Sequence, residues 1–214
     1  MNSSEPVGTI RALWRFPVKS MLGEELDAAD LSAGGIVGDR AYAIRDRETG
    51  KVASAKHSKR WPNLLECRAA FFNERGLPSA VPEGSFFDLF PLSVLTTSTL
   101  DRLAELEPQS RFDSRRFRMN VIVDTPAHGF VENEWVGRTL AIGDEVQLGV
   151  ALPDPRCVMP SLAQEDLPRD PLILKALARH NRIDVAGALY PCAGVYAVAE
   201  ATGTVRRDDR VSLV

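Results

Sequence analysis

The chain has 214 residues, with 26 lysines and arginines against 29 aspartates and glutamates and a formal net charge of -3. Its 44% hydrophobic and 26% charged content is ordinary for a water-soluble globular protein, and no segment approaches the roughly 20 apolar residues of a membrane helix. Proteins that neutralise many phosphates carry a basic excess, so this charge argues against broad nucleic-acid binding. We expect no membrane or nucleic-acid partner, and local cations must meet any anionic ligand.

The start of the chain and its cysteines predict a compartment. Residues 1–8 contain no basic segment followed by an apolar one, so no secretory signal is expected and the cytoplasm is the default location. Cys67, Cys157 and Cys192 lie far apart without zinc-knuckle spacing, which fits a reducing compartment. Cys67 follows two leucines and Cys192 has no adjacent cation, so we expect both to be buried as small hydrophobic residues.

The first third of the chain predicts short strands. Residues 9–16 form one, which a proline ends, and residues 24–31 and 40–46 form two more, separated by glycines. Residues 47–50 predict a turn. Short strands that are separated by glycines are typical of a β-barrel or a β-sandwich. Prolines and glycines are dense over residues 73–91, which indicates a loop or a boundary between two lobes.

The second half predicts two helices. Leucines over residues 100–106 share one face of a helix that Thr97 or Ser98 can cap. Asp170, with a proline directly after it, predicts the start of a second helix, which stops near His180.

Two segments of the second half repeat one pattern. In residues 137–148 and in residues 203–213, a glycine leads a short strand to a tight acidic turn, and a second alternating strand follows. Each segment therefore predicts a β-hairpin. Together they favour a closed β architecture.

A cluster of cations around one thiol is the best candidate for chemistry. Arg156 and Cys157 lie in a turn between a strand-like segment and a helix, where a neighbouring guanidinium favours the thiolate, the form that acts as nucleophile and soft-metal ligand. Lys19, Arg40 and Arg118 also occupy turns or strand ends. Because the arginine fork suits phosphate or carboxylate, the four cations together predict a cradle for an anionic cofactor.

Each of these residues also has a purely structural interpretation. A single lysine or arginine at a strand end is most often solvated. Ser20 and Asn120 can serve as turn-capping side chains, and Cys157 taken alone can be a small buried hydrophobic residue. The three histidines lie far apart and predict no metal site. The residues alone leave both interpretations open.

Taken in chain order, several segments form a recognisable set. They are residues 13–20, Gly38-Asp39-Arg40, residues 88–91 with 95–97, residues 117–123, Asp154-Pro155-Arg156-Cys157, and Gly203-Thr204-Val205 with Asp209. This set resembles the MOSC family, the molybdenum cofactor sulfurase C-terminal domains, and is most similar to the mitochondrial amidoxime-reducing component and its bacterial relatives. The resemblance implies a mainly β fold with a few short helices, in which a β-barrel MOSC domain (residues 91–214) packs on a small N-terminal β-barrel-like domain (residues 5–90).

The resemblance also implies a cofactor and its ligands. The cofactor is the molybdenum cofactor (molybdopterin), with Cys157 as the catalytic metal ligand and Arg156 as its neighbour. Pyridoxal phosphate binding is a further association that the resemblance brings. The implied cofactor contacts are Lys19, Ser20, Arg40, Asp88, Arg118, Asn120, Arg156 and Tyr196.

The implied activity is the reduction of small N-hydroxylated compounds. The chain has no cysteine cluster of the kind that binds an iron-sulfur centre, so we expect a separate electron-donor protein of the iron-sulfur, flavin or haem type. Residues 65–88 and 90–111 are shorter than the corresponding regions of the resembling proteins, which predicts a more exposed pterin.

Two other functions remain open from the sequence. Cys157 can act as a sulfur carrier, through a persulfide delivered to a metal-sulfur cluster or cofactor, with Arg156 stabilising the thiolate. The chain can also be a binding module without turnover. In that case Arg40→Ala and Arg118→Ala would leave every ligand affinity unchanged.

Overall fold

The computed structural model describes residues 4–71, 86–87 and 89–214. The strands are β1 (Glu5–Arg15), β2 (Glu24–Leu26), β3 (Ala28–Ser32), β4 (Gly35–Ile36), β5 (Leu92–Thr96), β6 (Val121–Asp124), β7 (Thr139–Ile142), β8 (Val146–Pro155), β9 (Arg182–Val185), β10 (Ala188–Ala201), β11 (Gly203–Arg206) and β12 (Arg210–Leu213). The α-helices are α1 (Thr97–Leu106) and α2 (Leu172–His180). The short 3-10 helices are η1 (Ala55–His57), η2 (Leu64–Glu66), η3 (Ser114–Phe117), η4 (Val131–Trp135) and η5 (Met159–Ser161). The predicted mainly β fold with few helices is confirmed.

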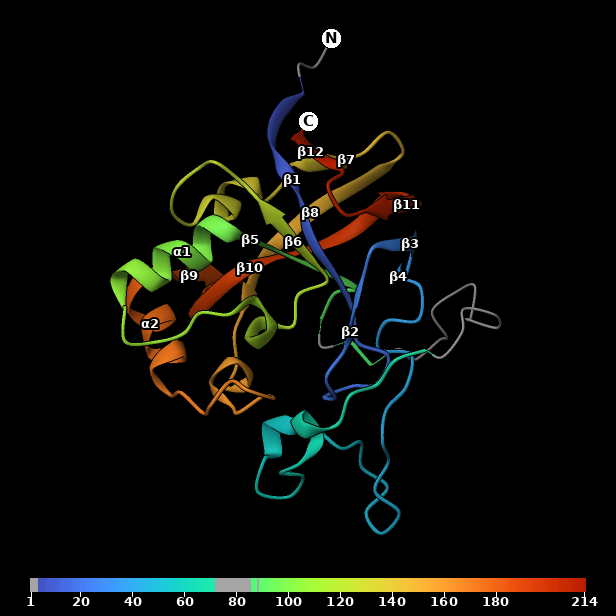
Figure 1. The fold of residues 1–214 in the computed structure, drawn as a ribbon, viewed down its shortest axis with the longest axis vertical. Helices are drawn as coiled ribbons and strands as arrows, with labels where there is room; N and C mark the ends of the chain where they lie inside the picture. Colours follow the sequence, from blue (N-terminus) through green and yellow to red (C-terminus); the bar gives the residue numbers. More distant parts are fainter. Residues whose placement is uncertain (1–3, 72–85, 88) are drawn as a thin grey trace.

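A closed β-barrel forms the centre of the molecule (Figure 1). Its seven described strands follow the order β1, β12, β7, β8, β10, β5 and β6, and β6 pairs again with β1. Among these pairs β5 and β6 run parallel and the others run antiparallel. Alternate residues point inward and form a buried core that includes Ile10, Leu92, Leu140, Leu148 and Val195. The predicted strand at residues 9–16 is confirmed as part of β1.

The two predicted hairpins have different outcomes. β7 and β8 pair with each other from Thr139–Gly149 to Ile142–Val146, so the first hairpin is confirmed. The second prediction is wrong, because β11 pairs with β3 whereas β12 pairs with β7 and β1. A tight turn separates the two strands, in which Asp209 Oδ2 accepts from the Arg206 amide across 2.7 Å. The turn therefore redirects the chain from a small sheet into the barrel.

The strand predicted at residues 40–46 is also wrong. Only isolated bridges form there, between Val18 and Tyr42 and between Arg45 and Val52. The backbone changes partner within a few residues, because the Tyr42 amide donates to the Pro17 carbonyl whereas the Ala53 amide donates to the Ile44 carbonyl. Within the part of the chain that the structure describes, no segment pairs with residues 40–46 over consecutive residues, so no strand ladder forms there.

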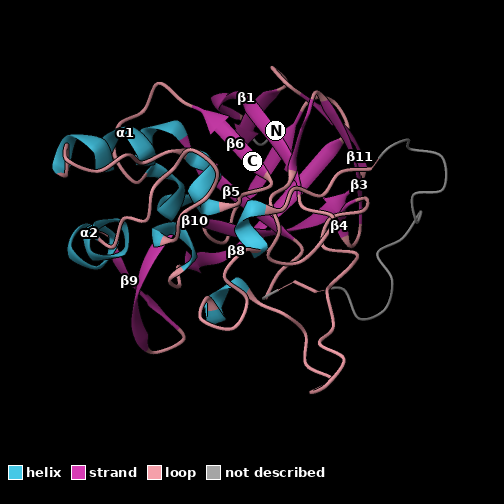
Figure 2. Ribbon diagram, turned by 60° about the horizontal axis from the view of Figure 1, so that its bottom comes forward, coloured by secondary structure: helices cyan, strands magenta, loops and turns pink. Residues whose placement is uncertain are grey.

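The two helices cover one flank of the barrel (Figure 2). Both lie where the sequence predicts them, and their buried residues Leu103, Ile173 and Leu177 share one apolar cluster. The cap of α1 lies one residue earlier than expected, because the Thr96 hydroxyl accepts from the Thr99 amide across 3.2 Å. Pro171 directly precedes α2, one residue after the predicted cap, and Asp170 Oδ1 accepts from the Leu172 amide across 2.9 Å. Neither helix combines the length and apolar character of a membrane crossing among the described residues.

The cysteines divide into three environments. Cys192 is fully buried, as predicted. Cys67 is exposed, so its predicted burial is wrong. The two leucines before Cys67 take the buried positions of η2, and at Cys67 the chain leaves that turn with extended backbone. Cys157 is half-buried.

Candidate functional site

One cleft collects the cations and the thiol that the sequence singled out. It lies between the loops after β1 and β4, the turn before β6 and the end of β8. Every candidate site residue that the structure describes lines it, namely Lys19, Ser20, Arg40, Arg118, Asn120, Arg156, Cys157 and Tyr196. Asp88 lies outside the described residues. Side chains from five separate parts of the sequence thus meet in one place.

The backbone is unusual at three of these positions. Ser20, Arg40 and Arg118 have φ values of 65°, 47° and 55°, in the left-handed region that non-glycine residues rarely adopt. They are half of the six such residues in the described part of the chain. Each conformation costs free energy, and such strain persists where the surrounding structure holds a functional group in place. The fold therefore holds these three residues in orientations that ordinary turns do not provide.

Arg40 is anchored by a buried carboxylate. Asp39 is fully buried, its Oδ1 accepts from the Phe16 amide across 2.6 Å, and its Oδ2 accepts from Arg40 Nη1. Asn120 Nδ2 also donates to Asp39 Oδ2 across 3.0 Å. Because a buried ion pair holds only when its remaining atoms are satisfied, these bonds keep the Arg40 guanidinium in a defined position.

Asn120 is a positioning residue of the cleft. Its amide donates to Asp39 and to the Trp14 carbonyl, and its Oδ1 accepts from both the amide and the hydroxyl of Ser93. Both side-chain donors and the acceptor are thus used within the protein. The amide acts on the site by orienting Asp39 and, through it, Arg40.

Arg118 and Arg40 share an aromatic support. The Phe16 ring lies 4.3 Å from the Arg118 guanidinium carbon and 5.0 Å from that of Arg40, measured to the ring centroid. Arg118 Nη1 also donates to the Met21 carbonyl across 2.5 Å. The Phe16 ring and the Met21 carbonyl hold the Arg118 guanidinium in place, and the same ring and Asp39 hold that of Arg40. Both planar guanidinium groups therefore lie fixed at the lining of the cleft.

Arg156 is largely enclosed in the wall of the cleft. Its Nη1 pairs with the buried Asp154 and its Nη2 donates to the Phe117 carbonyl, whereas Nε is buried without a partner among the described residues. Burial disfavours the charged form, but the charges of Asp154, Tyr196 and Cys157 outweigh it and raise the pKa of Arg156. A fixed positive charge therefore lies directly beside the thiol.

Cys157 follows the end of β8 and packs into a small apolar cluster. That cluster contains Ala53, Ala55, Met159 and Leu162, with Cys157 packed against it. Its sulfur is neither in the barrel core nor fully solvated. A half-buried thiol at a cleft wall, beside a permanent cation, suits a soft-metal ligand or a nucleophile.

Sequence reasoning missed several residues of the cleft. Lys56, at η1, adds a fifth cation to the lining, and Ser54 and Ser93 add hydroxyls. Asp39 and Asp154, which orient Arg40 and Arg156, were not selected either. The Gly38-Asp39-Arg40 and Asp154-Pro155-Arg156 sequences placed each carboxylate beside its arginine, and that adjacency was the available signal. Lys19, in contrast, was selected, and its Nζ donates to the Phe86 carbonyl across 2.9 Å.

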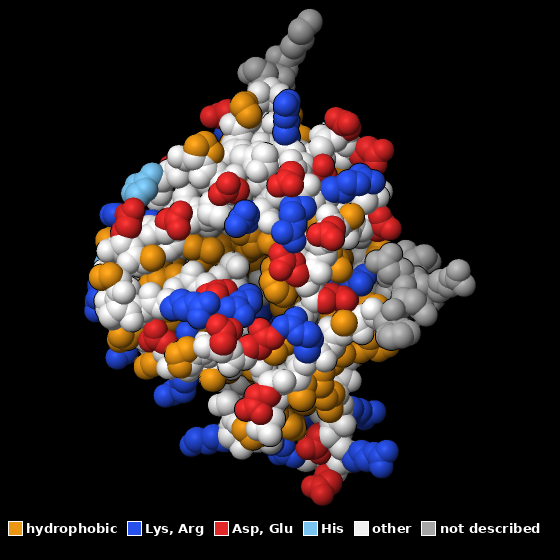
Figure 3. All heavy atoms as spheres, viewed as in Figure 1, with side chains coloured by type: hydrophobic (Ala, Val, Ile, Leu, Met, Phe, Trp, Pro, Cys, Tyr) orange, Lys and Arg blue, Asp and Glu red, His pale blue; other side chains and the backbone are white. Residues whose placement is uncertain are grey.

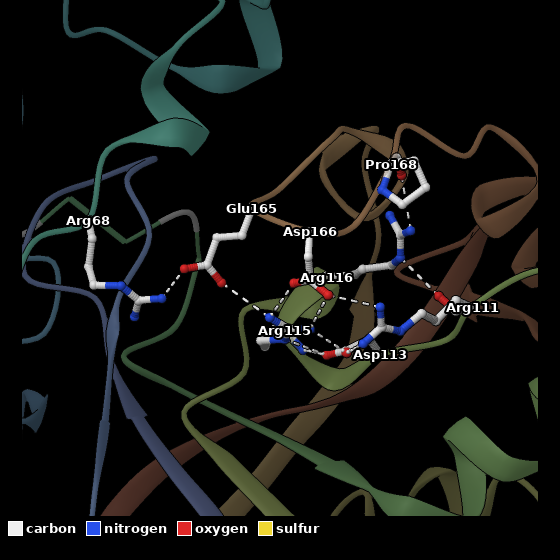
Figure 4. A network of polar contacts seen from close by, with 8 residues as sticks. All are labelled: Arg68, Arg111, Asp113, Arg115, Arg116, Glu165, Asp166 and Pro168. Atoms are coloured by element: carbon white, nitrogen blue, oxygen red, sulfur yellow. Dashed lines mark hydrogen bonds and ion pairs between the residues drawn. The ribbon is translucent and has the colours of Figure 1, made fainter.

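The loop after Cys157 is tied down by a polar network (Figure 4). Glu165 lies between Arg68 and Arg115 and accepts from both, so it links a segment near β2 to η3. Arg116 is buried, and its guanidinium donates to backbone carbonyls of Arg111, Pro160, Leu162 and Pro168. This network holds the chain on the far side of Cys157 and so limits where the sulfur can move.

Comparison with known families agrees with this geometry. The family model described as the MOSC domain matches residues 83–212, and the model described as the MOSC N-terminal beta barrel domain matches residues 7–99. The chain belongs to the MOSC family. The MOSC domain is associated with molybdenum-cofactor binding, and residues of both matched ranges line the cationic cleft. No curated protein matches the sequence significantly.

Solved structures share the MOSC fold at low sequence identity. The YuaD protein from Bacillus subtilis is 19% identical, with a TM-score of 0.60, over 99% of this chain and 98% of that one. A structure described as a hypothetical protein is 14% identical, with a TM-score of 0.50, over 99% of this chain and 69% of that one. At these identities the likeness concerns the fold alone.

Proposed function

We propose that the chain is a molybdenum-cofactor-dependent oxidoreductase that reduces small N-hydroxylated compounds. The observation that carries the proposal is the convergence of a half-buried thiol, Cys157, with five cations in one cleft whose lining contains a single described carboxylate, Asp154. An anionic cofactor needs charge-assisted donors that outweigh the cost of removing it from water. The cleft supplies them from several separate loops.

The residues present fit such a cofactor. Cys157 Sγ would be the metal ligand, because a thiolate is the donor that a soft metal prefers. Arg40 and Arg118 would hold the phosphate with their planar forks, and Lys19 and Lys56 would add point charges at the cleft wall. The Arg156 Nε is a buried donor without a partner among the described residues, so it can take an acceptor from the cofactor. When bound, the cofactor supplies the two-electron redox chemistry that cleaves the N–O bond.

The chain's own residues would bind the cofactor and hold it in a fixed orientation. Arg156 keeps a positive charge beside Cys157. The stacked rings of Phe90 and Tyr196, with centroids 5.6 Å apart, form an aromatic wall on which a planar group can lie. Because the loop beyond Cys157 is fixed by Arg116, the ligand sulfur stays in one position between reaction cycles.

Metal and pterin analysis tests the proposal. The protein and its Cys157→Ser and Cys67→Ser variants are purified anaerobically from cofactor-replete cells and assayed for molybdenum, for pterin and for reduction of an aryl amidoxime by reduced methyl viologen. We expect the wild type and Cys67→Ser to contain molybdenum and pterin and to be active, and Cys157→Ser to retain less of the metal. Cys67 is the matched control because its thiol is exposed. A wild type without molybdenum would remove the proposal.

The same preparations distinguish the sulfur-carrier alternative. If Cys157 carries a persulfide, the peptide that contains it gains the mass of one sulfur atom, and the denatured protein shows no pterin fluorescence. Pterin fluorescence with an unmodified Cys157 peptide supports the reductase.

A further inference from the structure

A strongly basic segment projects beside the cleft. Residues 41–61, the basic arm, contain six lysines and arginines against two carboxylates, in a chain whose net charge is -3. All six cations are exposed, namely Arg45, Arg47, Lys51, Lys56, Lys59 and Arg60. Figure 1 shows this segment at the lower end of the molecule, and Figure 3 shows lysine and arginine side chains around that end. The basic arm therefore carries a local excess of positive charge.

The basic arm has a defined shape. Its two sides are joined where the Asp46 amide donates to the Lys51 carbonyl and the Ala53 amide donates to the Ile44 carbonyl. At the tip, Asp46 accepts from the amides of Glu48 and Thr49 and from Arg60. The Thr49 amide and the Arg60 guanidinium lower the pKa of Asp46 to about 2. One of the two acidic groups is thus occupied within the arm, which leaves a net positive surface.

Exposed apolar side chains lie among these cations. Tyr42, Ile44 and Val52 are 52%, 41% and 38% exposed, although large apolar residues are usually buried. Aromatic and apolar anchors surrounded by charged residues are the composition of protein–protein contact sites. A phosphate surface would gain nothing from the aliphatic side chains of Ile44 and Val52.

The basic arm is also in direct contact with the site. Ser54 and Lys56 line the cleft, and Ala53 and Ala55 are buried in the apolar cluster against which Cys157 packs. A molecule bound on the arm would therefore lie at the mouth of the cleft, one packing layer from the sulfur. Among the described residues, no other group of exposed cations combines such an excess of positive charge with a position beside Cys157.

We propose that the basic arm is the docking surface for a small acidic electron-carrier protein. The inference rests on the proposed function, because reduction of an N–O bond takes an electron pair and a pair of protons and releases water, and the carrier is oxidised as it supplies the electrons. An acidic carrier is repelled by the net negative remainder of the molecule and attracted by the arm, so it arrives with its redox centre facing the cleft. Tyr42, Ile44 and Val52 then supply the apolar contact.

Direct binding tests the docking surface. A flavodoxin and a plant-type ferredoxin are titrated into the as-purified protein by calorimetry at low and at high salt. The arm variant is Arg47→Glu with Lys59→Glu, whose side chains are exposed and lie outside the cleft. The control is Arg206→Glu with Arg210→Glu, which makes the same change of net charge on exposed residues of β11 and β12.

We expect at least one carrier to bind, with an affinity that falls with salt. The arm variant should weaken this binding by about tenfold or more, and the control by much less. Equal weakening by both variants, or binding of neither carrier, would overturn the proposal. Binding to anionic vesicles is measured as well. If the arm variant weakens binding to vesicles but leaves the affinity for the carrier unchanged, the proposal is also overturned. Since binding is measured whatever the metal content, a protein without molybdenum that still binds a carrier through the arm refutes the reductase and leaves the docking surface standing.

Discussion

Arg40 Nη2 donates to the backbone carbonyl of Arg118 across 3.1 Å, although 78 residues separate the two in sequence. Both guanidinium groups also lie on Phe16. This pair joins the loop after β4 to the turn before β6 and places two planar forks on one wall of the cleft. The arrangement makes their function in anion binding testable residue by residue.

Replacing each fork by a point charge should weaken cofactor retention. Arg40→Lys and Arg118→Lys keep the charge but lose the bidentate geometry, which at charged hydrogen bonds is worth about 1.5–3 kcal/mol, or roughly tenfold or more in affinity. The measurement is the rate at which pterin leaves the purified protein, with Arg102→Lys on the exposed face of α1 as control. Unchanged release rates in both cleft variants would favour a binding module whose cations are merely solvated.

Asp39 should be important for stability as well as for the site. Asp39→Asn leaves Arg40 without its charged partner and disturbs bonds to Phe16 and Asn120, so we expect a loss of about 2–4 kcal/mol in the free energy of unfolding. Urea unfolding measures it. Asp27→Asn, at a side chain that is 97% exposed, should change stability by no more than about 0.5 kcal/mol. If Asp39→Asn is as stable as the wild type, the Asp39–Arg40 pair does not organise the cleft.

Arg116 should control the loop that follows Cys157. Arg116→Lys removes a buried fork from several carbonyls, and we expect faster hydrogen exchange over residues 160–168 and a loss of about 1–3 kcal/mol in the free energy of unfolding. The nearby Arg111→Lys is the control, because its side chain is more than half exposed. A loop that exchanges at the wild-type rate in Arg116→Lys would mean that other contacts fix Cys157.

Glu132 should make stability depend on pH. It is fully buried, its Oε2 accepts from Thr96 and Thr99, and burial raises its pKa above the ordinary 4.5 against the effect of those hydroxyls. The folded state then holds the proton more tightly than the unfolded state, so the free energy of unfolding falls as pH rises from about 4.5 through the folded pKa.

Glu132→Gln should flatten that slope. Urea unfolding over a series of pH values measures it, and Glu134→Gln, an exposed neighbour in η4, should keep the wild-type dependence. If the slopes of the wild type and Glu132→Gln coincide, Glu132 is not the responsible group.

The three thiols should differ in reactivity. Burial raises the pKa of Cys192 to about 11, so native alkylation should spare it, and its labelling should require unfolding. Cys67 is exposed and Cys157 is half-buried at the cleft, so both should react in the folded protein once it is freed of cofactor. Peptide mass spectrometry after timed labelling measures the order. Cys192 labelled as fast as Cys67 would contradict the buried position.

Local patterns predicted the elements but not their long-range pairing. Alternation and turn residues are sufficient for β1 and for the β7–β8 hairpin, because both depend on neighbouring residues. The partner of β11 is β3, more than 170 residues away, and no local pattern specifies that pairing. Cys67 was misassigned for a related reason, since two preceding leucines indicate burial nearby but not the direction in which the next side chain points.

The residues of the site could be predicted from the sequence, but their arrangement in space could not. The charged turns and the thiol could be selected one by one, with the resemblance to the MOSC family joining them. Their meeting in one cleft depends on barrel closure and on left-handed backbone at Ser20, Arg40 and Arg118, which a side-chain pattern does not reveal. Lys56 was missed because an exposed lysine in a short helical turn is usually just solvated.

X-ray absorption at the molybdenum edge tests the central claim most directly. Anaerobically loaded wild-type protein and Cys157→Ser are compared for the number of sulfur atoms around the metal, with Cys67→Ser as control. We predict one sulfur fewer around the metal that Cys157→Ser retains, and no change in Cys67→Ser. An identical sulfur shell in the wild type and Cys157→Ser would contradict the account.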